Sequence, residues 1–230
     1  MCVLMSSVKA LLVTANVGSL FAAAEDNSEP LLLSWIARFK DTLLSLRPQF
    51  VALHCQEVGG KSEVESRRTP PFVRALLNAF SEQDFPSARL FVDQLLSRDD
   101  AFTALANAYF VHKSLAENAF IFNFKEQRFE SVGGREVHSG DIEDNAFKDK
   151  RKFPQHFFPQ CQWSRKGFMR TRWRLREGVA FDLINVHLFH DADNVVATSG
   201  FPSPYARNRR LALDWLLQHV TSETPHFLFG

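Results

Sequence analysis

The chain has 230 residues, of which 45% are hydrophobic and 23% are charged. This length and apolar content allow a globular domain with a substantial core and exclude an intrinsically disordered chain. Lys and Arg number 27 against 26 Asp and Glu, a net charge of +1, so no overall positive field favours nucleic acid or a polybasic membrane anchor. Any anion-binding function must therefore come from local clusters of basic residues.

The cysteines and the apolar stretches bear on the cellular compartment of the protein. Its three cysteines, Cys2, Cys55 and Cys161, are odd in number and lack the spacing of metal ligands. Cys55 lies in an apolar run that predicts a buried strand, which favours a reducing, cytoplasmic location. Residues 1–17 lack the basic start and long apolar stretch of a secretory signal, and charges interrupt residues 31–46, so we expect neither a signal peptide nor a membrane span.

The first part of the chain predicts a strand, a helix and a second strand. Ala10 to Ala15 is a short apolar run that ends at Asn16, typical of a buried strand leading into a turn. Apolar residues then recur at helical spacing from Leu32 to Leu46, and Phe50 to Cys55 predicts the second buried strand. This succession favours a layered α/β fold, with ligand-binding groups at the carboxyl ends of the strands.

The middle of the chain predicts a helix followed by short strands. Phe72 to Phe80 has the spacing of a helix, and two prolines introduce it. Gly133 to Pro159 is rich in charge, Gly and Pro, and we interpret it as a surface excursion. Four runs before it predict strands, the last two paired through a tight turn, and these runs are Arg89 to Val92, Ala104 to Val111, Ala119 to Phe124 and Arg128 to Val132.

The last third of the chain predicts two long strands and a helix. The strands are expected at Gly167 to Leu175 and at Val179 to Asn185. Asn194 to Tyr205 is expected to be a loop, and Arg209 to Val220 a helix with its apolar residues facing inward. The chain ends on Phe227 to Gly230, which has the pattern of a buried strand.

Two polar residues follow the first two predicted strands. Glu57 comes directly after an apolar run and precedes Gly59 and Gly60, so its carboxylate is expected at a strand end beside a flexible turn. Mg²⁺ prefers carboxylate oxygens in such a place and keeps several waters. Asn16 would lie at the neighbouring strand end, where it could position a metal-bound water or a phosphate oxygen. The alternatives are a helix cap or surface charge for Glu57 and a turn residue for Asn16.

Two histidines follow the strand predicted to end at Asn185. His187 and His190 flank Leu188 and Phe189 at the exit of an alternating strand. Imidazoles at such a place can donate hydrogen bonds to a phosphoryl group or act as acid and base near neutral pH. The competing interpretation is a pair of buried histidines with a purely structural role.

The densest basic stretch begins at Arg165 and Lys166. The turn that these residues form with the next glycine suits an anion, because glycine lets the backbone approach and lysine supplies a point charge. Alternation along the following strand places Arg170 and Arg172 on one face, where guanidinium groups match phosphate geometry. Arg209 opens the last predicted helix, where a cation does not favour the helix dipole. A solvated basic face remains the alternative for these arginines.

Five segments carry more specific motifs: Val13-Thr14-Ala15-Asn16-Val17-Gly18-Ser19, Ala52-Leu53-His54-Cys55-Gln56-Glu57 with Gly59-Gly60-Lys61, Trp163-Ser164-Arg165-Lys166-Gly167-Phe168, Arg170-Thr171-Arg172-Trp173, and Asn185-Val186-His187-Leu188-Phe189-His190-Asp191. Together they closely resemble the type I inositol polyphosphate 5-phosphatases. The likeness runs from about Lys9 to Gly230 and is weakest between Lys61 and Gln155.

The resemblance implies the endonuclease/exonuclease/phosphatase fold, a four-layered α/β sandwich shared with DNase I. It also implies Mg²⁺-dependent removal of the 5-phosphate from inositol 1,4,5-trisphosphate and inositol 1,3,4,5-tetrakisphosphate in phosphoinositide and calcium signalling. By motif, Glu57 matches the magnesium ligand, Asn16 its polar partner, and His187 the histidine that contacts the scissile phosphate. The further phosphate-binding residues that it implies are Lys166, Arg170, Arg172, His190 and Arg209.

The family pattern continues after Gly230 into a Gly-Asp-Phe-Asn-Phe-Arg loop, a Cys-Asp-Arg motif and an Asp-His pair. We therefore expect residues 1–230 to be the N-terminal part of a single catalytic domain, an incomplete sandwich with little activity and low stability alone. The Asp that the family uses to activate water would lie outside these residues. Association with the membrane surface is an expectation only for a longer form of the protein.

Two other functions remain open from the sequence. One is another phosphodiesterase of the same fold, which the near-neutral charge disfavours if the substrate is a nucleic acid. The other is an inositol phosphate binder without turnover that uses Lys166, Arg170, Arg172 and His187. We expect no nucleic acid partner, and the trisphosphate and tetrakisphosphate are equal candidates as substrate.

Overall fold

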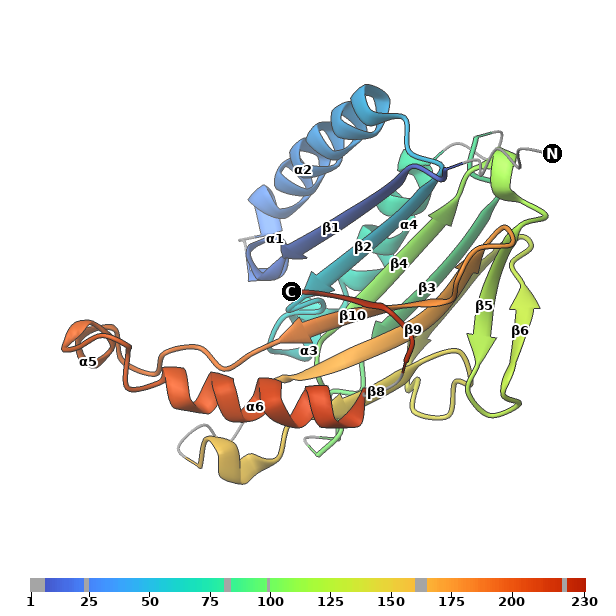
Figure 1. The fold of residues 1–230 in the computed structure, drawn as a ribbon. Helices are drawn as coiled ribbons and strands as arrows, with labels where there is room; N and C mark the ends of the chain where they lie inside the picture. The colour runs from blue at the N-terminus through green and yellow to red at the C-terminus, as the bar shows by residue number, and fades with distance from the viewer. Residues whose placement is uncertain (1–6, 23–24, 81–83, 99, 160–164, 221–222) are drawn as a thin grey trace.

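Two β-sheets lie face to face, with helices on their outer sides, in the computed structural model of the chain (Figure 1). The structure describes residues 7–22, 25–80, 84–98, 100–159, 165–220 and 223–230. The motif residues Trp163 and Ser164 lie outside the described residues, as do the cysteines Cys2 and Cys161. The layers run helix, sheet, sheet, helix, which confirms the four-layered α/β fold that the resemblance implies.

The first sheet has five strands, and its parallel pair β1 and β2 carries the first two motifs. Strand β4 runs antiparallel to both β2 and β3, while β7 runs parallel to β3 at the edge. Because β1 and β2 are parallel and in register, their carboxyl ends meet at the same end of the sheet. The spatial order of the strands is β1 (Ala10–Asn16), β2 (Phe50–Gln56), β4 (Ala106–Val111), β3 (Ser87–Asp93) and β7 (Arg135–Gly140).

The second sheet is mostly antiparallel, and its longest strand is β9 (Gly167–Leu175). Strand β8 (Asp149–Lys152) pairs with the first half of β9, and β5 pairs with its second half. The last strand of the chain runs parallel to β10. The spatial order is β11 (His226–Phe229), β10 (Phe181–His187), β9, β5 (Ala119–Asn123) and β6 (Arg128–Ser131).

Helices cover the outer face of each sheet. On the first sheet lie α1 (Gly18–Ala22), α2 (Glu25–Leu46) and α4 (Thr69–Ala79), preceded by the short α3 (Glu63–Ser66). The second sheet is covered by α6 (Ala206–His219). The remaining helical segments are α5 (Asn194–Thr198) and the 3₁₀ turns Lys113–Leu115 and Gln155–Phe157.

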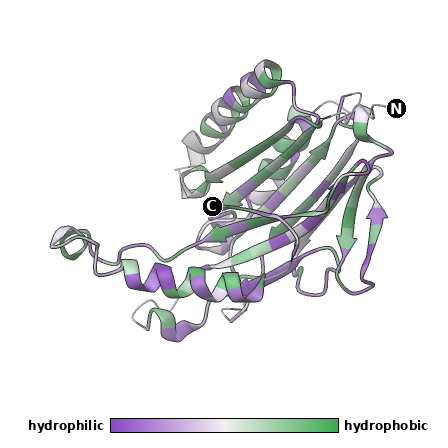
Figure 2. Cartoon of the chain, in the orientation of Figure 1, coloured by the Kyte–Doolittle hydropathy of each residue, from purple (hydrophilic) through white to green (hydrophobic). Residues whose placement is uncertain are grey.

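Alternation along the strands explains how three apolar layers form. In β2, Val51 and Leu53 point to the helices, whereas Phe50 and Ala52 point to the second sheet. Between the sheets, Phe50 meets Trp173 edge to face, with ring centroids 5.0 Å apart. Burial on both faces requires nearly continuous apolar strands, and Figure 2 shows β1 and β2 as largely hydrophobic.

The long strands and helices agree with the sequence predictions. The prediction that Gly133 to Pro159 forms a surface excursion was wrong. This segment contains β7 and β8, and it buries Ile142, Phe153 and Phe158. Charged residues make both strands hard to recognise in the sequence, because β7 lies at a sheet edge and Lys150 of β8 is buried in an ion pair with Asp93 at 2.8 Å. The loop predicted for Asn194 to Tyr205 contains the short helix α5.

The structure also bears on the predictions for Cys55 and for membrane spans. Cys55 is buried and carries a free thiol. Within the described ranges, the helices lack the combination of length and apolar character that a membrane span requires.

Candidate functional site

Three strand ends converge on one pocket. Asn16 ends β1, Glu57 follows β2, and His187 ends β10 of the other sheet. The pocket has a volume of about 360 Å³ and is lined by Thr14, Asn16, Gln56, Val186, His187, Leu188 and Gly230. The pocket therefore lies where the two sheets meet, and each sheet supplies part of its polar lining.

Glu57 is held in an unusual backbone conformation beside Asn16. Its φ of +62° is in the left-handed region, which non-glycine residues rarely adopt. The neighbouring turn is tight: a Cβ atom added to Gly18 would lie 2.5 Å from Glu57 Oε2 and 3.3 Å from Asn16 Oδ1. Gly18 also donates its backbone N–H to Asn16 Oδ1 at 3.0 Å. Glycine at this turn thus lets the oxygens of Asn16 and Glu57 approach the same space.

His187 joins the carboxylate to a lysine. Its Nε2 lies 3.6 Å from Glu57 Oε1 and 2.5 Å from Lys166 Nζ. The pKa of His187 is lowered to about 3, first by burial and then by nearby positive charge, above all that of Lys166. The imidazole is therefore neutral near pH 7, and its Nε2 accepts the hydrogen bond from Lys166.

The other ring nitrogen of His187 is an unpaired donor. When Nε2 accepts, the proton of a neutral imidazole is on Nδ1. Nδ1 is buried and has no hydrogen-bond partner among the described residues. Since unpaired buried donors are rare in proteins, this N–H is a candidate contact for a bound anion.

Basic side chains surround the carboxylate. Arg165 donates a hydrogen bond to the backbone carbonyl of Gly60, three residues after Glu57. Burial lowers the pKa of Arg165, while the charge of Glu57 opposes that shift. The pKa of His190 is also lowered, first by burial and then by Lys166. Arg165 and Lys166 therefore share the surroundings of Glu57, and the carboxylates of Glu65 and Asp191 also act on Arg165 and His190.

The structure does not bring Arg170 and Arg172 to this pocket. Their neighbours in β9, Thr171 and Trp173, are fully buried between the sheets, so alternation turns both arginines to the outer face. Arg170 is paired with Asp149 at 3.0 Å, and Arg172 with Asp182 at 2.7 Å. Both guanidinium groups also lie over phenylalanine rings, Arg172 over Phe122 of β5 and Arg170 over Phe124, the residue after β5. These contacts stabilise the second sheet.

Arg209 lies close to the histidine motif but is also paired. It forms an ion pair with Asp191, the residue after His190, at 2.5 Å. The contact ties the first turn of α6 to the segment that leaves the pocket. Arg209 therefore reaches the site through Asp191.

The oxygens of Asn16 and Glu57 suit Mg²⁺. This ion takes hard oxygen ligands, often one or two carboxylates, and completes its shell with water and substrate phosphate. Glu57 supplies such a carboxylate and Asn16 a carboxamide oxygen, at the point where the Gly18 turn leaves room. Among the described residues, no cluster of three or more His, Cys, Asp or Glu side chains could hold a metal. The residues therefore fit a magnesium ion that keeps most of its water.

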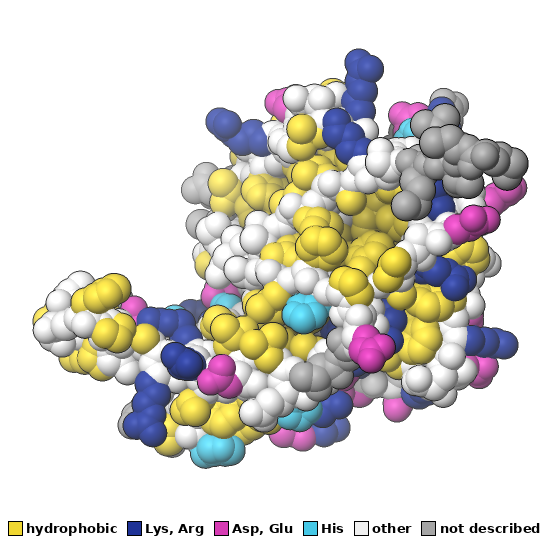
Figure 3. Space-filling view, viewed as in Figure 1, with side chains coloured by type: hydrophobic (Ala, Val, Ile, Leu, Met, Phe, Trp, Pro, Cys, Tyr) yellow, Lys and Arg dark blue, Asp and Glu magenta, His cyan; other side chains and the backbone are white. Residues whose placement is uncertain are grey.

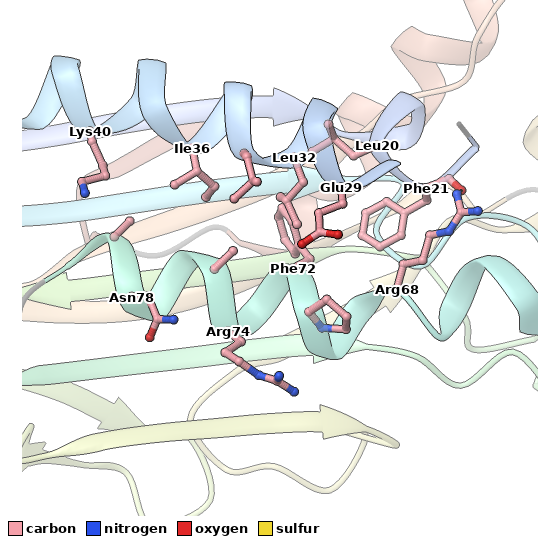
Figure 4. A pocket seen from close by; sticks show the side chains of 14 residues that line it. Leu20, Phe21, Glu29, Leu32, Ile36, Lys40, Arg68, Phe72, Arg74 and Asn78 are labelled. Carbon is pink, nitrogen blue, oxygen red and sulfur yellow. The ribbon is translucent and has the colours of Figure 1, made fainter. Parts of the chain in front are cut away.

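Larger pockets lie elsewhere, along the outer helices. One of about 630 Å³ lies between α2 and α4 (Figure 4), and another of about 720 Å³ adjoins it at Lys40 and Asn78. Apolar side chains such as Leu32, Ile36 and Phe72 dominate the first. Neither is lined by a residue of the strand-end site, so size alone does not locate the chemistry.

The comparisons with known proteins agree with the motifs. The chain is 43% identical to inositol polyphosphate-5-phosphatase A of Rattus norvegicus over 225 residues, and 42% identical to that of Homo sapiens. The resemblance to the type I 5-phosphatases is therefore confirmed. A probable type I inositol 1,4,5-trisphosphate 5-phosphatase of Caenorhabditis elegans is 37% identical over 230 residues.

These matches to 5-phosphatases cover 96% to 97% of this chain but 53% to 54% of the relatives. The chain thus spans about half the length of the curated relatives it matches. No family model matches the chain. Among solved structures, humanized D. rerio TDP2 aligns with 94% of this chain and 62% of that one, at a TM-score of 0.46 and 13% identity.

Proposed function

We propose that the strand-end pocket binds inositol polyphosphates and serves Mg²⁺-dependent hydrolysis of their 5-phosphate, with the 1,4,5-trisphosphate and the 1,3,4,5-tetrakisphosphate as substrates. The observation that supports this most is that His187 Nε2 lies between two charged groups, 3.6 Å from Glu57 Oε1 and 2.5 Å from Lys166 Nζ. The names of the relatives, at 37% to 43% identity, supply the substrate class. Because both sheets contribute to one pocket, we assign residues 1–230 to a single catalytic domain.

The residues in and beside the pocket differ in charge, and each charge suits a different role. Glu57 and Asn16 would hold Mg²⁺, which supplies charge neutralisation at a phosphoryl oxygen. Lys166 binds phosphate as a point charge. His187 stays neutral near pH 7 and donates from Nδ1, while His190 is a further donor at the exit of β10. These groups orient the phosphate and stabilise the negative charge that develops on it.

Binding without turnover is the second candidate function. The observation that favours it is that the described residues contain no cluster of three or more acidic, histidine or cysteine side chains for a metal. Lys166 and His187 suffice for anion binding, whereas in-line hydrolysis also needs a group that activates water. We therefore propose that residues 1–230 alone release phosphate slowly.

We also propose a cytoplasmic location. It is supported by the free thiol of Cys55, buried between β1 and β4, and by a soluble substrate class. Imaging of the tagged chain would test this, and retention in an oxidising compartment would contradict it.

Calorimetric titration with inositol 1,4,5-trisphosphate, combined with a phosphate-release assay, tests the function. The trisphosphate should bind, and Lys166→Met should weaken binding about 10-fold to 100-fold, because a charge-assisted hydrogen bond contributes about 1.5–3 kcal/mol. Release that needs Mg²⁺ and disappears in Glu57→Ala would support the enzyme, and binding without release would support the binder.

Arg172→Met is the matched control for Lys166→Met. It removes one cation of β9 from outside the pocket, so it should lower stability but leave the affinity for the trisphosphate unchanged. A folded wild-type chain that does not bind the trisphosphate would refute the proposal.

A further inference from the structure

A buried hydrogen-bond cluster connects the two sheets directly beneath the pocket. At its centre is Asn185 of β10, which is fully buried. Its Nδ2 donates to the carbonyl oxygens of Cys55 at 3.1 Å and Ala106 at 3.2 Å. It also donates to Asn107 Oδ1 at 2.8 Å. One side chain of the second sheet thus contacts both β2 and β4 of the first.

Gln56 completes the cluster from the opposite sheet. Its Nε2 donates to Asn185 Oδ1 at 2.8 Å and to Thr14 Oγ1 at 3.1 Å. Gln56 is 3% exposed, so its carboxamide also depends on protein partners. The bond between Gln56 and Asn185 therefore joins β1 and β2 to β10.

The cluster lies next to two residues of the candidate site. Gln56 directly precedes Glu57, and Asn185 precedes His187 by two residues, on the same face of β10. Glu57 and His187 belong to different sheets, yet the atoms that face each other are 3.6 Å apart. Contacts between the sheets must therefore set this distance.

Apolar packing alone fixes that distance poorly. Hydrophobic attraction is non-directional, so large side chains between two sheets tolerate small sliding motions. Hydrogen bonds at 2.8 Å have a preferred direction, and a carboxamide left without partners in a buried site costs about 1–3 kcal/mol. A sliding motion would break such bonds, so the cluster opposes it.

We propose that Asn185 and Gln56 are positioning residues that hold Glu57 against His187 by pinning β10 to β2. The inference rests on the proposed function, since it assigns the pinned distance to binding of the phosphate and its metal. Asn185 is not among the residues that line the pocket, so it acts without contact to the substrate, whereas Gln56 also lines the pocket. Their effect is transmitted through the backbone, over one residue to Glu57 and two to His187.

The test compares Asn185→Leu with the double variant Asn185→Leu, Gln56→Leu. The single variant leaves Gln56 without its partner and should lose both stability and trisphosphate affinity. The double variant removes both polar groups, so it should regain much of the stability. Its affinity should remain reduced about 10-fold or more, as is usual when support of a metal or ligand site is lost. A purely structural role predicts that affinity returns together with stability.

Thr171→Val is the matched control. Thr171 is fully buried between the same sheets, and its hydroxyl donates to Tyr109 Oη at 2.8 Å, but it lies farther along β9 from the pocket. This variant should be less stable and bind the trisphosphate like the wild type. A stable double variant with wild-type affinity would overturn the proposal. If Asn185→Leu does not fold, Gln56→Met gives the same comparison, because it leaves Asn185 its three acceptors.

A structural readout separates this inference from the proposed function. Crystal structures of the wild type and the double variant give the separation of Glu57 Oε1 and His187 Nε2 without any ligand. If the wild type does not bind the trisphosphate, the proposed function fails, but an increased separation in the variant still supports the positioning role of Asn185 and Gln56. An unchanged separation refutes that positioning role whether or not the trisphosphate binds.

Discussion

At the scale of single residues, the candidate metal ligand is a strained residue. Glu57 adopts a φ of +62°, which for an L-residue costs about 1–2 kcal/mol relative to ordinary conformations. Two glycines follow within three positions, and Gly18 packs against the carboxylate from α1. The turn thus directs the carboxylate of Glu57 towards Gly18 and Asn16, at a cost in stability.

The strain predicts an unusual ranking of two variants. Glu57→Asn should be more stable than Glu57→Gln by about 1 kcal/mol, because asparagine tolerates the left-handed region better than glutamine. Both variants remove the carboxylate, so charge does not contribute to the difference. Urea unfolding of both proteins in the absence of Mg²⁺ measures it. Equal stabilities, or a more stable glutamine variant, would show that the turn relaxes without strain.

Most of the residues that form the pocket could be predicted from the sequence, but not all of the basic ones. Glu57, Asn16 and His187 follow apolar runs, and strand ends of an α/β fold converge, so their proximity is expected. Arg170 and Arg172 have the same charge and spacing as phosphate ligands. Their shared partner Asp182 is 12 positions from Arg170 and 10 from Arg172 in sequence but on another strand, so only the strand pairing identifies the ion pairs.

At the scale of elements, the helix α4 ends on an arginine from another element. Arg135 of β7 donates from Nη1 to the carbonyl of Leu77 at 3.1 Å, and from Nη2 to those of Phe80 at 2.7 Å and Phe85 at 2.9 Å. Carbonyl groups at a helix C-terminus lack partners within the helix and carry partial negative charge. Arg135 therefore caps α4 and fixes it to the sheet edge.

Loss of this cap should be costly. Arg135→Met keeps most of the aliphatic length but removes three charge-assisted hydrogen bonds, so the free energy of unfolding should fall by about 2 kcal/mol or more. Arg135→Lys should recover little, because one ammonium cannot match the planar spread of the guanidinium group. Thermal unfolding of the two variants measures both effects. Wild-type stability of Arg135→Lys would indicate that charge rather than geometry makes the cap.

The same contact explains why β7 was missed in the sequence. Its residues Arg135, Glu136 and His138 make the segment read as a polar excursion. Arg135 caps α4, Glu136 pairs with Arg89, and the ring of His138 stacks on Phe91 with centroids 5.3 Å apart. Each polar group thus has a partner that lies far away in sequence, and residue type alone cannot indicate such pairing.

At the scale of the whole molecule, two sheets of mixed strands enclose an aromatic core with polar groups inside it. Tyr109 is fully buried and shares its hydroxyl with Asn107, Thr171 and His54. The space-filling view shows apolar side chains gathered over the side where the C-terminal strand lies, as well as on the projecting α5 segment (Figure 3). The strand and helix pattern predicts a layered α/β fold, and the order of four layers followed from the resemblance to the 5-phosphatases. The buried polar cluster followed from neither, because a lone Asn or Thr in an apolar run gives no sign of its partner.

Buried histidines should make the whole molecule sensitive to acid. The pKa of His54 is lowered to about 3 by burial, and that of His187 is lowered to about 3 as well. Their ordinary value is 6.5, so between about pH 6.5 and pH 3 the unfolded chain binds protons that the folded chain does not. The contribution of the two neutral histidines to the free energy of unfolding is therefore complete above this pH window, and it is lost as the pH decreases through the window.

The expected loss follows from linkage. Each histidine contributes about 1.4 kcal/mol per pH unit inside the window, so the free energy of unfolding should fall by about 2 kcal/mol per histidine between pH 7 and pH 5. Urea unfolding at the two pH values measures this change. His54→Gln should reduce the loss by about half, whereas His156→Gln, at an exposed position, should leave it unchanged. An equally large loss in the His54 variant would mean that the buried imidazole is already protonated in the fold, where its ring stacks on Phe229 with centroids 3.9 Å apart.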